Sequence, residues 1–173
     1  NELAILSDML GIDIWEVVEA AKTKPFGFQS FRPGPGVGGH CIPIDPKYLS
    51  FKTRQVGQPV RFVELAQEIN NSMPNYVVAR VSELMNRNEI LLKNSKILIL
   101  GVAYKKDIGD TRESPALDII KSLLEKSVDI SFYDPHVDEL VVNKCSISSE
   151  EKMENLSNYD LILIHTPHTK FHE

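Results

Sequence analysis

Apolar side chains recur with helical spacing at the start of the chain. A leucine stripe up to Leu10 predicts the end of a helix, which Gly11 closes because glycine readily takes the left-handed conformation of a helix C-cap. Asp13 and Glu16 then stand in the capping-box pattern of a second, short helix. Residues 23–45 follow as a long loop, whose three phenylalanines argue against disorder, so a functional loop is expected.

Helical spacing returns after this loop. A helix is predicted from Pro46 to about Val56, and a much longer one follows over 62–88. Pro74 interrupts the apolar stripe of the long helix and is expected to kink it or split it in two. A stripe of this length is typical of a dimer interface, although it can also pack only against its own chain.

The apolar pattern changes after Lys93. A short continuous apolar run ends at Gly101, Ser114 and Pro115 carry the signals of a helix start, and two further strand-like runs follow at 129–135 and 161–164. A weak helix is expected between these two strands. Alternation of strands and helices predicts a parallel sheet whose ligands bind beyond the carboxyl ends of the strands.

The predicted fold class is therefore α/β. We expect an all-helical central dimerisation region over 1–92 and an incomplete doubly wound parallel-sheet (Rossmann-like) domain over 93–173. With 173 residues, 42% of them hydrophobic and 25% charged, the chain has the composition of an ordinary globular protein.

Charge and cysteine content narrow the function classes. A net charge of -5 disfavours nucleic acid and anionic membranes as partners. The two cysteines, Cys41 and Cys145, lie far apart and form neither a disulfide framework nor a metal-binding spacing, so no metal is predicted. Neither a signal peptide nor a membrane-spanning run is found, and a cytoplasmic location fits best.

The most informative segment is the glycine-dense loop over 34–46. Its glycines end at Cys41, with Asp45 four residues later. A thiol can add to a carbonyl carbon and hold it as a thioester, and a carboxylate can orient the water that releases the acid. The alternatives are a surface turn around a buried structural thiol and a cysteine hydrolase that uses a histidine, for which adjacent His40 is poorly aimed.

Basic and aromatic residues follow the first predicted strand. Tyr104, Lys105, Lys106 and Arg112 lie at its carboxyl end, where basic groups could hold a phosphate. A solvated charge cluster is the alternative. The strand lacks the Gly-x-Gly-x-x-Gly turn that follows the first strand of dinucleotide-binding domains, so dinucleotide binding by this half is not expected.

Motifs in the same order along nearly the whole chain resemble the UDP-glucose/GDP-mannose dehydrogenase family. The loop around Cys41 is most similar to the UDP-N-acetylglucosamine 6-dehydrogenase branch. Ile44 stands where UDP-glucose enzymes usually carry a lysine, which puts one cofactor contact of those enzymes in question. The segments that carry the resemblance are 25–31, 34–46, 68–70 with 73–74, 101–106, 110–115, 133–135 and 165–171.

This resemblance implies a two-step oxidation of the C6 hydroxyl of a UDP-sugar to a carboxylate, with NAD as cofactor. UDP-N-acetylglucosamine is the expected substrate, with UDP-glucose or UDP-N-acetylmannosamine as alternatives. By the same resemblance Cys41 and Asp45 are catalytic. The implied substrate-binding residues are Arg32, Pro33, Gly34, Pro35, Gly36, Val37, Gly38, Tyr104 and Lys105. The implied cofactor-binding residues are Cys41, Ile42, Pro43, Ile44 and Arg112.

The resemblance also implies parts outside this chain. An NAD domain with the catalytic lysine and asparagine is expected upstream, and the last strands with a substrate-contacting arginine downstream. The chain alone is therefore expected not to turn over, and a non-catalytic dimerisation and UDP-binding module is the second hypothesis. A homodimer or higher homo-oligomer is the expected assembly.

Overall fold

The computed structural model describes residues 1–172 and divides the chain into two compact units, Asn1–Gly34 and the part from Pro35 onward. The first unit contains helices α1 (Glu2–Leu10) and α2 (Ile14–Lys22). Gly11 ends α1 in the left-handed conformation, with φ 68°, and the Asp13 side chain accepts a 2.8 Å hydrogen bond from the Trp15 N–H at the start of α2. Both predicted caps are confirmed.

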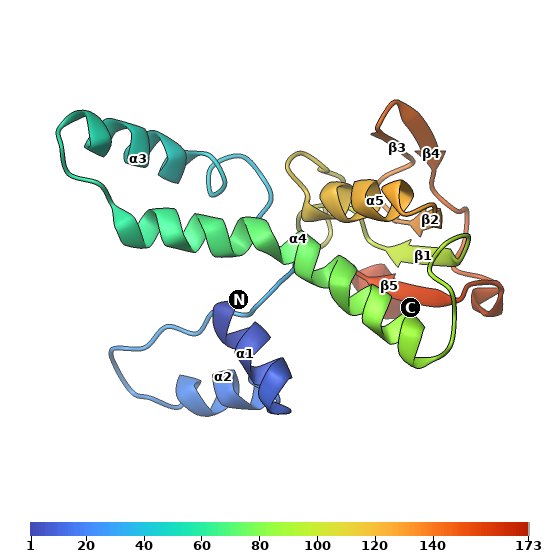
Figure 1. The fold of residues 1–173 in the computed structure, drawn as a ribbon, viewed down its shortest axis with the longest axis horizontal. Coiled ribbons are helices and arrows are strands. Elements are labelled where there is room, and N and C mark those ends of the chain that lie inside the picture. The colour runs from blue at the N-terminus through green and yellow to red at the C-terminus, as the bar shows by residue number, and fades with distance from the viewer. Residues whose placement is uncertain (173) are drawn as a thin grey trace. The chain divides into compact units, whose positions relative to one another are not determined.

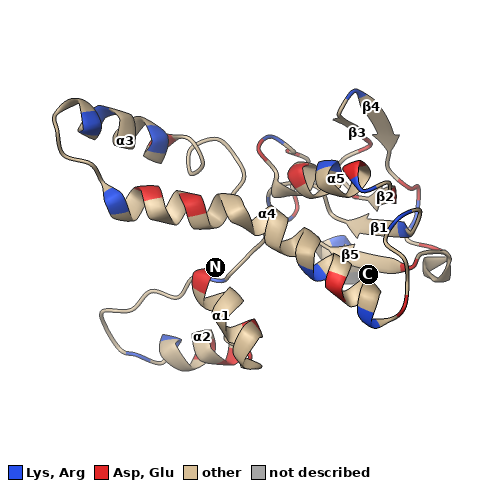
Figure 2. Ribbon diagram, viewed as in Figure 1, with Lys and Arg blue, Asp and Glu red and all other residues tan. Residues whose placement is uncertain are grey.

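The second unit begins with a helical hairpin. Helix α3 (Asp45–Gln55) and the long helix α4 (Arg61–Arg87) run side by side (Figure 1), and both carry basic and acidic residues (Figure 2). Arg54 donates a 2.9 Å hydrogen bond to Glu64 between the two helices. Pro74 does not split α4, which is continuous and changes direction near its middle (Figure 1). The missing proline N–H therefore produces the predicted kink without ending the helix.

A parallel sheet of three strands forms the centre of the second unit. Strands β1 (Lys96–Leu100), β2 (Asp129–Tyr133) and β5 (Leu161–Ile164) lie in the order β2-β1-β5. Helix α5 (Pro115–Glu125) connects β1 to β2, and the Ser114 hydroxyl accepts a hydrogen bond from the Ala116 N–H at its start. The chain turns to one side of β1 for β2 and to the other side for β5, which is the start of a doubly wound sheet.

The expected weak helix between β2 and β5 is wrong. Strands β3 (Glu139–Val142) and β4 (Cys145–Ser148) pair antiparallel there, followed by the short 3₁₀ helix η1 (Leu156–Asn158). Asn143 and Lys144 both have positive φ, 52° and 67°, which is the backbone of a two-residue hairpin turn. Leu140 and Val142 are buried while Val141 is exposed, which is the alternation of a half-buried strand. This alternation favours a strand over the expected helix.

One hydrophobic core lies between the sheet, α5 and the second half of α4. Val78, Val81 and Met85 of α4 pack in it with Ile97 and Ile99 of β1. In contrast, Phe62 in the first half of α4 is 90% exposed. The apolar stripe of α4 is thus partly used within its own chain and partly left on the surface. Within residues 1–172, no helix is long and apolar enough to cross a membrane.

Candidate active site

Cys41 lies four residues before Asp45, the first residue of α3. Its backbone carbonyl accepts hydrogen bonds from the N–H groups of Ile44, at 3.1 Å, and Asp45, at 2.8 Å, so a tight turn joins the cysteine to the helix. The thiol is exposed, which contradicts the alternative of a buried structural cysteine. Asp45 is the first residue of α3, and the helix dipole favours negative charge at this end.

The glycines before Cys41 pack against the chain itself. A Cβ atom at Gly38 would lie 2.5 Å from Tyr104 Cβ and 2.8 Å from the Glu113 carbonyl oxygen, closer than such atoms can approach. At Gly39, where φ is +90°, a Cβ would lie 2.9 Å from the Tyr104 ring. The Gly39 N–H also donates a 3.2 Å hydrogen bond to the Arg112 carbonyl. Glycine is required here so that the loop before Cys41 can rest on the loop that follows β1.

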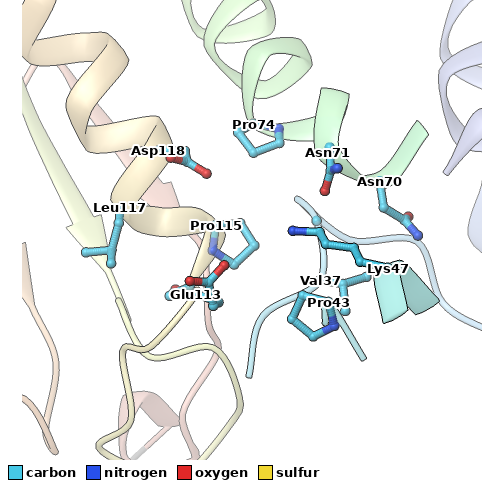
Figure 3. Close-up of a pocket in the computed structure, with 12 residues that line it drawn as sticks. Val37, Pro43, Lys47, Asn70, Asn71, Pro74, Glu113, Pro115, Leu117 and Asp118 are labelled. Carbon is cyan, nitrogen blue, oxygen red and sulfur yellow. The ribbon is translucent and has the colours of Figure 1, made fainter. Parts of the chain in front are cut away.

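A cavity of about 350 Å³ lies beside this contact, between the glycine loop, α3, α4 and α5 (Figure 3). Gly36 and Val37 of the implied substrate set and Pro43 of the implied cofactor set share its wall. Lys47 extends into it opposite the carboxylates of Glu113 and Asp118 (Figure 3). Its other lining residues are Asn70, Asn71, Pro74, Ser114, Pro115 and Leu117.

The carboxyl end of β1 does not fit a dinucleotide. Asp134, directly after β2, is buried, and its carboxylate accepts hydrogen bonds from the N–H groups of Val102, at 2.7 Å, and Ala103, at 3.2 Å. In a dinucleotide-binding domain, the N–H groups after the first strand face the pyrophosphate, and an acidic residue at the end of the second strand binds the ribose. Here the Asp134 carboxylate accepts hydrogen bonds from the N–H groups after the first strand, so both are already used. This agrees with the absence of the Gly-x-Gly-x-x-Gly turn.

Arg112 is held by an acid of its own loop. Its guanidinium donates to both carboxylate oxygens of Asp110, at 2.7 to 3.2 Å. These hydrogen bonds lower the pKa of Asp110 to about 2. Arg112 is exposed, so a phosphate could replace the Asp110 carboxylate and accept the same bidentate hydrogen bonds from the guanidinium.

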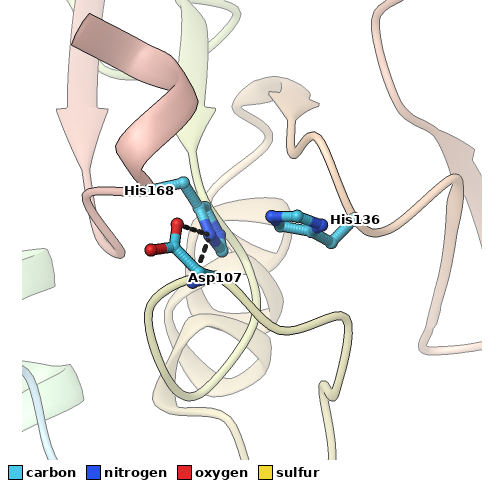
Figure 4. Close-up of side chains that lie close together, drawn as sticks. All are labelled: Asp107, His136 and His168. Carbon is cyan, nitrogen blue, oxygen red and sulfur yellow. Dashed lines mark hydrogen bonds and ion pairs between the residues drawn. The ribbon is translucent and has the colours of Figure 1, made fainter.

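Three potential metal ligands, Asp107, His136 and His168, lie close together (Figure 4). The buried His168 ring already uses both nitrogens, since Nδ1 accepts a 2.9 Å hydrogen bond from the Asp107 N–H and Nε2 lies 3.1 Å from Asp134 Oδ2. A metal would have to replace one of these bonds. The cluster is therefore a hydrogen-bonded structural network.

His165 lies at the end of β5, beside the carboxyl end of β1. Its Nδ1 bonds to Thr166 Oγ1 at 2.9 Å, and burial lowers the pKa of the ring to about 4. Its Nε2 is buried without a hydrogen-bond partner among the described residues. Within residues 1–172, the hydrogen-bonded histidine rings bond to groups that follow β1, β2 and β5 and not to the Cys41 thiol.

The structure brings part of the predicted site together. Gly38 and Gly39 pack against Tyr104, and the next residue, Lys105, is exposed. Arg32, Pro33 and Gly34 belong to the first unit, where Arg32 lies 3.6 Å from Glu19. Asp134 was missed by sequence reasoning, although an acid directly after a strand is a signal that could have found it.

Comparison with known proteins finds two models of one family along the chain. Residues 1–72 match the model of the UDP-glucose/GDP-mannose dehydrogenase family, central domain, and residues 98–173 match that family's UDP binding domain. A UDP-N-acetyl-D-mannosamine dehydrogenase of Methanococcus vannielii is 36% identical over 99% of this chain and 37% of its own length.

Other relatives carry different substrate names. A UDP-N-acetyl-D-glucosamine 6-dehydrogenase of Salmonella typhi is also 36% identical, over 99% of this chain and 40% of its own. The solved structure of a UDP-D-ManNAc dehydrogenase from Pyrococcus horikoshii superposes with a TM-score of 0.85 at 30% identity, covering 98% of this chain and 38% of that one. The chain thus spans about two fifths of the length of these relatives, and it belongs to the UDP-glucose/GDP-mannose dehydrogenase family.

Proposed function

We propose that this chain is the part of an NAD-dependent nucleotide-sugar 6-dehydrogenase that supplies the catalytic cysteine and binds the UDP end of the substrate. The observation that carries the proposal is the exposed Cys41 at the amino end of α3, on a glycine loop that rests against Tyr104. This contact joins the proposed nucleophile to the loop proposed to bind the nucleotide. A hydrolase or a structural cysteine would not need it.

In the proposed reaction, Cys41 acts on the C6 aldehyde of the sugar. The thiol adds to the carbonyl carbon to form a thiohemiacetal, and oxidation converts this adduct into a thioester. Asp45, one turn away, orients or deprotonates the water that hydrolyses the thioester to the acid and returns the thiol. The exposed position of Cys41 leaves room for the substrate carbon.

NAD supplies the hydride acceptor for both oxidations when it is bound. The β1 turn does not fit its pyrophosphate, because Asp134 already takes the N–H groups of Val102 and Ala103. We propose that this chain contributes the Cys41–Ile44 backbone and the Arg112 guanidinium to a cofactor site formed mainly by another part of the protein. Arg112 would then exchange Asp110 for a phosphate.

The substrate is proposed to be a UDP-N-acetylhexosamine. The names of the relatives support the N-acetyl group, but relatives with the gluco and the manno name are equally similar, at 36% identity. The Cys41 loop favours UDP-N-acetylglucosamine, with UDP-N-acetylmannosamine as the competitor. A homodimer and a cytoplasmic location complete the proposal.

The test uses the intact protein with Cys41→Ser. Serine fills nearly the same space but is a far poorer nucleophile than a thiolate. We expect NADH release with either UDP-N-acetylhexosamine to fall by at least a thousandfold, while the dissociation constant for UDP stays within about twofold. Full turnover by the serine variant would remove Cys41 from the mechanism, and Cys145→Ser is the matched control that should keep full activity.

A further inference from the structure

One buried histidine lies between the two loops at the carboxyl edge of the sheet. His168 follows β5, and its side chain is fully buried. Because the Asp107 backbone N–H can only donate, His168 Nδ1 must be the acceptor of their 2.9 Å bond, and the ring proton lies on Nε2, which donates to Asp134. The orientation and tautomer of the ring are thus fixed by its partners.

A second set of hydrogen bonds joins the segment after β5 to Asp107. Its carboxylate accepts hydrogen bonds from the N–H group of Thr169, at 2.7 Å, and from the Thr169 hydroxyl, at 2.6 Å. These bonds lower the pKa of Asp107. Asp107 has a φ of 60°, a left-handed conformation that is unfavourable for a residue with a side chain. His168 and Thr169 together hold this left-handed backbone in place, and Figure 4 shows the His168 ring against Asp107.

Asp134 holds the beginning of the same loop, directly after β1. The Asp134 oxygen that bonds His168 also accepts the N–H groups of Val102 and Ala103. His168 therefore connects the beginning and the end of residues 102–107, which we call the β1 loop. Tyr104, on which the glycine loop rests, and Lys105 lie between these two fixed points.

We propose that His168 is a positioning residue that holds the β1 loop in the conformation in which Tyr104 and Lys105 receive the nucleotide diphosphate of the substrate. This inference rests on the proposed function. His168 is buried and reaches no ligand itself, so it acts on nucleotide binding through the loop. The prediction is a loss of affinity without a loss of chemistry at Cys41.

The first measurement compares His168→Gln with His136→Gln in the intact protein. The glutamine amide can reach the position of Nε2 and donate to Asp134. It leaves no acceptor at the position of Nδ1, so the Asp107 N–H loses its partner. We expect the dissociation constant for UDP, measured by calorimetry, and the KM for the UDP-sugar to rise about tenfold, and kcat at saturation to stay within about twofold. His136→Gln changes only an exposed ring that lies against His168, 5.1 Å between centroids, and should bind UDP like the wild type.

The second measurement asks whether His168 acts through Lys105. Lys105→Ala alone should weaken UDP binding about tenfold, since one charge-assisted contact is lost. In the His168→Gln background it should cost less than about threefold, because the lysine is no longer held in place. Deuterium exchange of the peptide covering 102–110 should also be faster in His168→Gln without any ligand, and Thr169→Val should produce a weaker form of both effects if His168→Gln folds poorly.

The outcomes separate the two proposals. Normal UDP binding by His168→Gln and Thr169→Val, or a full effect of Lys105→Ala in the histidine variant, would overturn the positioning role while UDP binding stands. If the wild-type protein binds no UDP, the proposed function and this inference both fall. Unchanged deuterium exchange over 102–110 would contradict the role of His168 even in the absence of nucleotide.

Discussion

At the scale of single residues, Cys41 and Asp45 depend on the turn that joins them. The Asp45 N–H donates to the Cys41 carbonyl at 2.8 Å, so the carboxylate stays within one turn of the thiol. If Asp45 serves the water that attacks the thioester, Asp45→Asn should slow hydrolysis more than hydride transfer. Mass spectrometry of the intact protein during turnover should then find an adduct on Cys41. Slow turnover without any adduct would mean that Asp45 acts earlier or only supports the loop.

His165 makes a different prediction, about pH. Burial lowers the pKa of its ring to about 4 in the folded protein, whereas the ordinary pKa of a histidine in an unfolded chain is 6.5. The folded state thus favours the neutral ring. The contribution of neutral His165 to the free energy of unfolding is therefore complete above about pH 6.5 and is lost as the pH falls toward 4. A shift of this size corresponds to roughly 3 kcal/mol at most.

Urea unfolding at pH 7.5 and 5 can test this sign. His165→Gln has no titrating ring, so its free energy of unfolding should fall less between the two pH values than that of the wild type. His136→Gln, which replaces an exposed ring, is the matched control and should follow the wild type. An equal loss in His165→Gln and wild type would assign the acid sensitivity to other groups.

At the scale of elements, the packing of the glycine loop on the β1 loop is the decisive contact. A methyl group at Gly38 would collide with Tyr104 and the Glu113 carbonyl, neither of which can move cheaply. Gly38→Ala should therefore destabilise the protein by about 1 to 3 kcal/mol and lower activity by displacing Cys41. Gly57→Ala, where φ is +79° but nothing lies within 4 Å, shows the cost of backbone strain alone. Wild-type stability and activity in Gly38→Ala would disprove the contact.

Local patterns predicted most elements but not their contacts. The strands of the parallel sheet and the cap at Ser114 follow from short apolar runs and from a polar residue before proline. The β3–β4 hairpin was missed because its alternation covers few residues and its turn, Asn143-Lys144, lacks glycine. The dense glycines mark the loop as unusual but do not indicate that Gly38 makes room for Tyr104. That partner lies 66 residues away, and no local pattern points to it.

At the scale of the whole molecule, the surface of α4 bears on assembly. One face of its second half packs in the core, but its first half exposes Phe62, at 90%, and Leu65, at 48%, and the paired helix α3 exposes Phe51, at 63%. Apolar residues of this size on one helical hairpin are typical of an interface between copies of a chain. We therefore expect the dimer interface on the first half of α4 together with α3, and not along the whole length of α4.

Sedimentation of the intact protein should accordingly show a dimer or a larger symmetric assembly. Phe62→Asp should raise its dissociation constant at least tenfold, because a charge would be buried against apolar side chains in the interface. Val141→Asp introduces the same charge at a residue that is 70% exposed on the β3–β4 hairpin, and it should leave the assembly unchanged. A folded wild-type monomer at high concentration, or an assembly indifferent to Phe62→Asp, would show that the exposed face of α3 and α4 is covered by another part of the protein and not by a second copy.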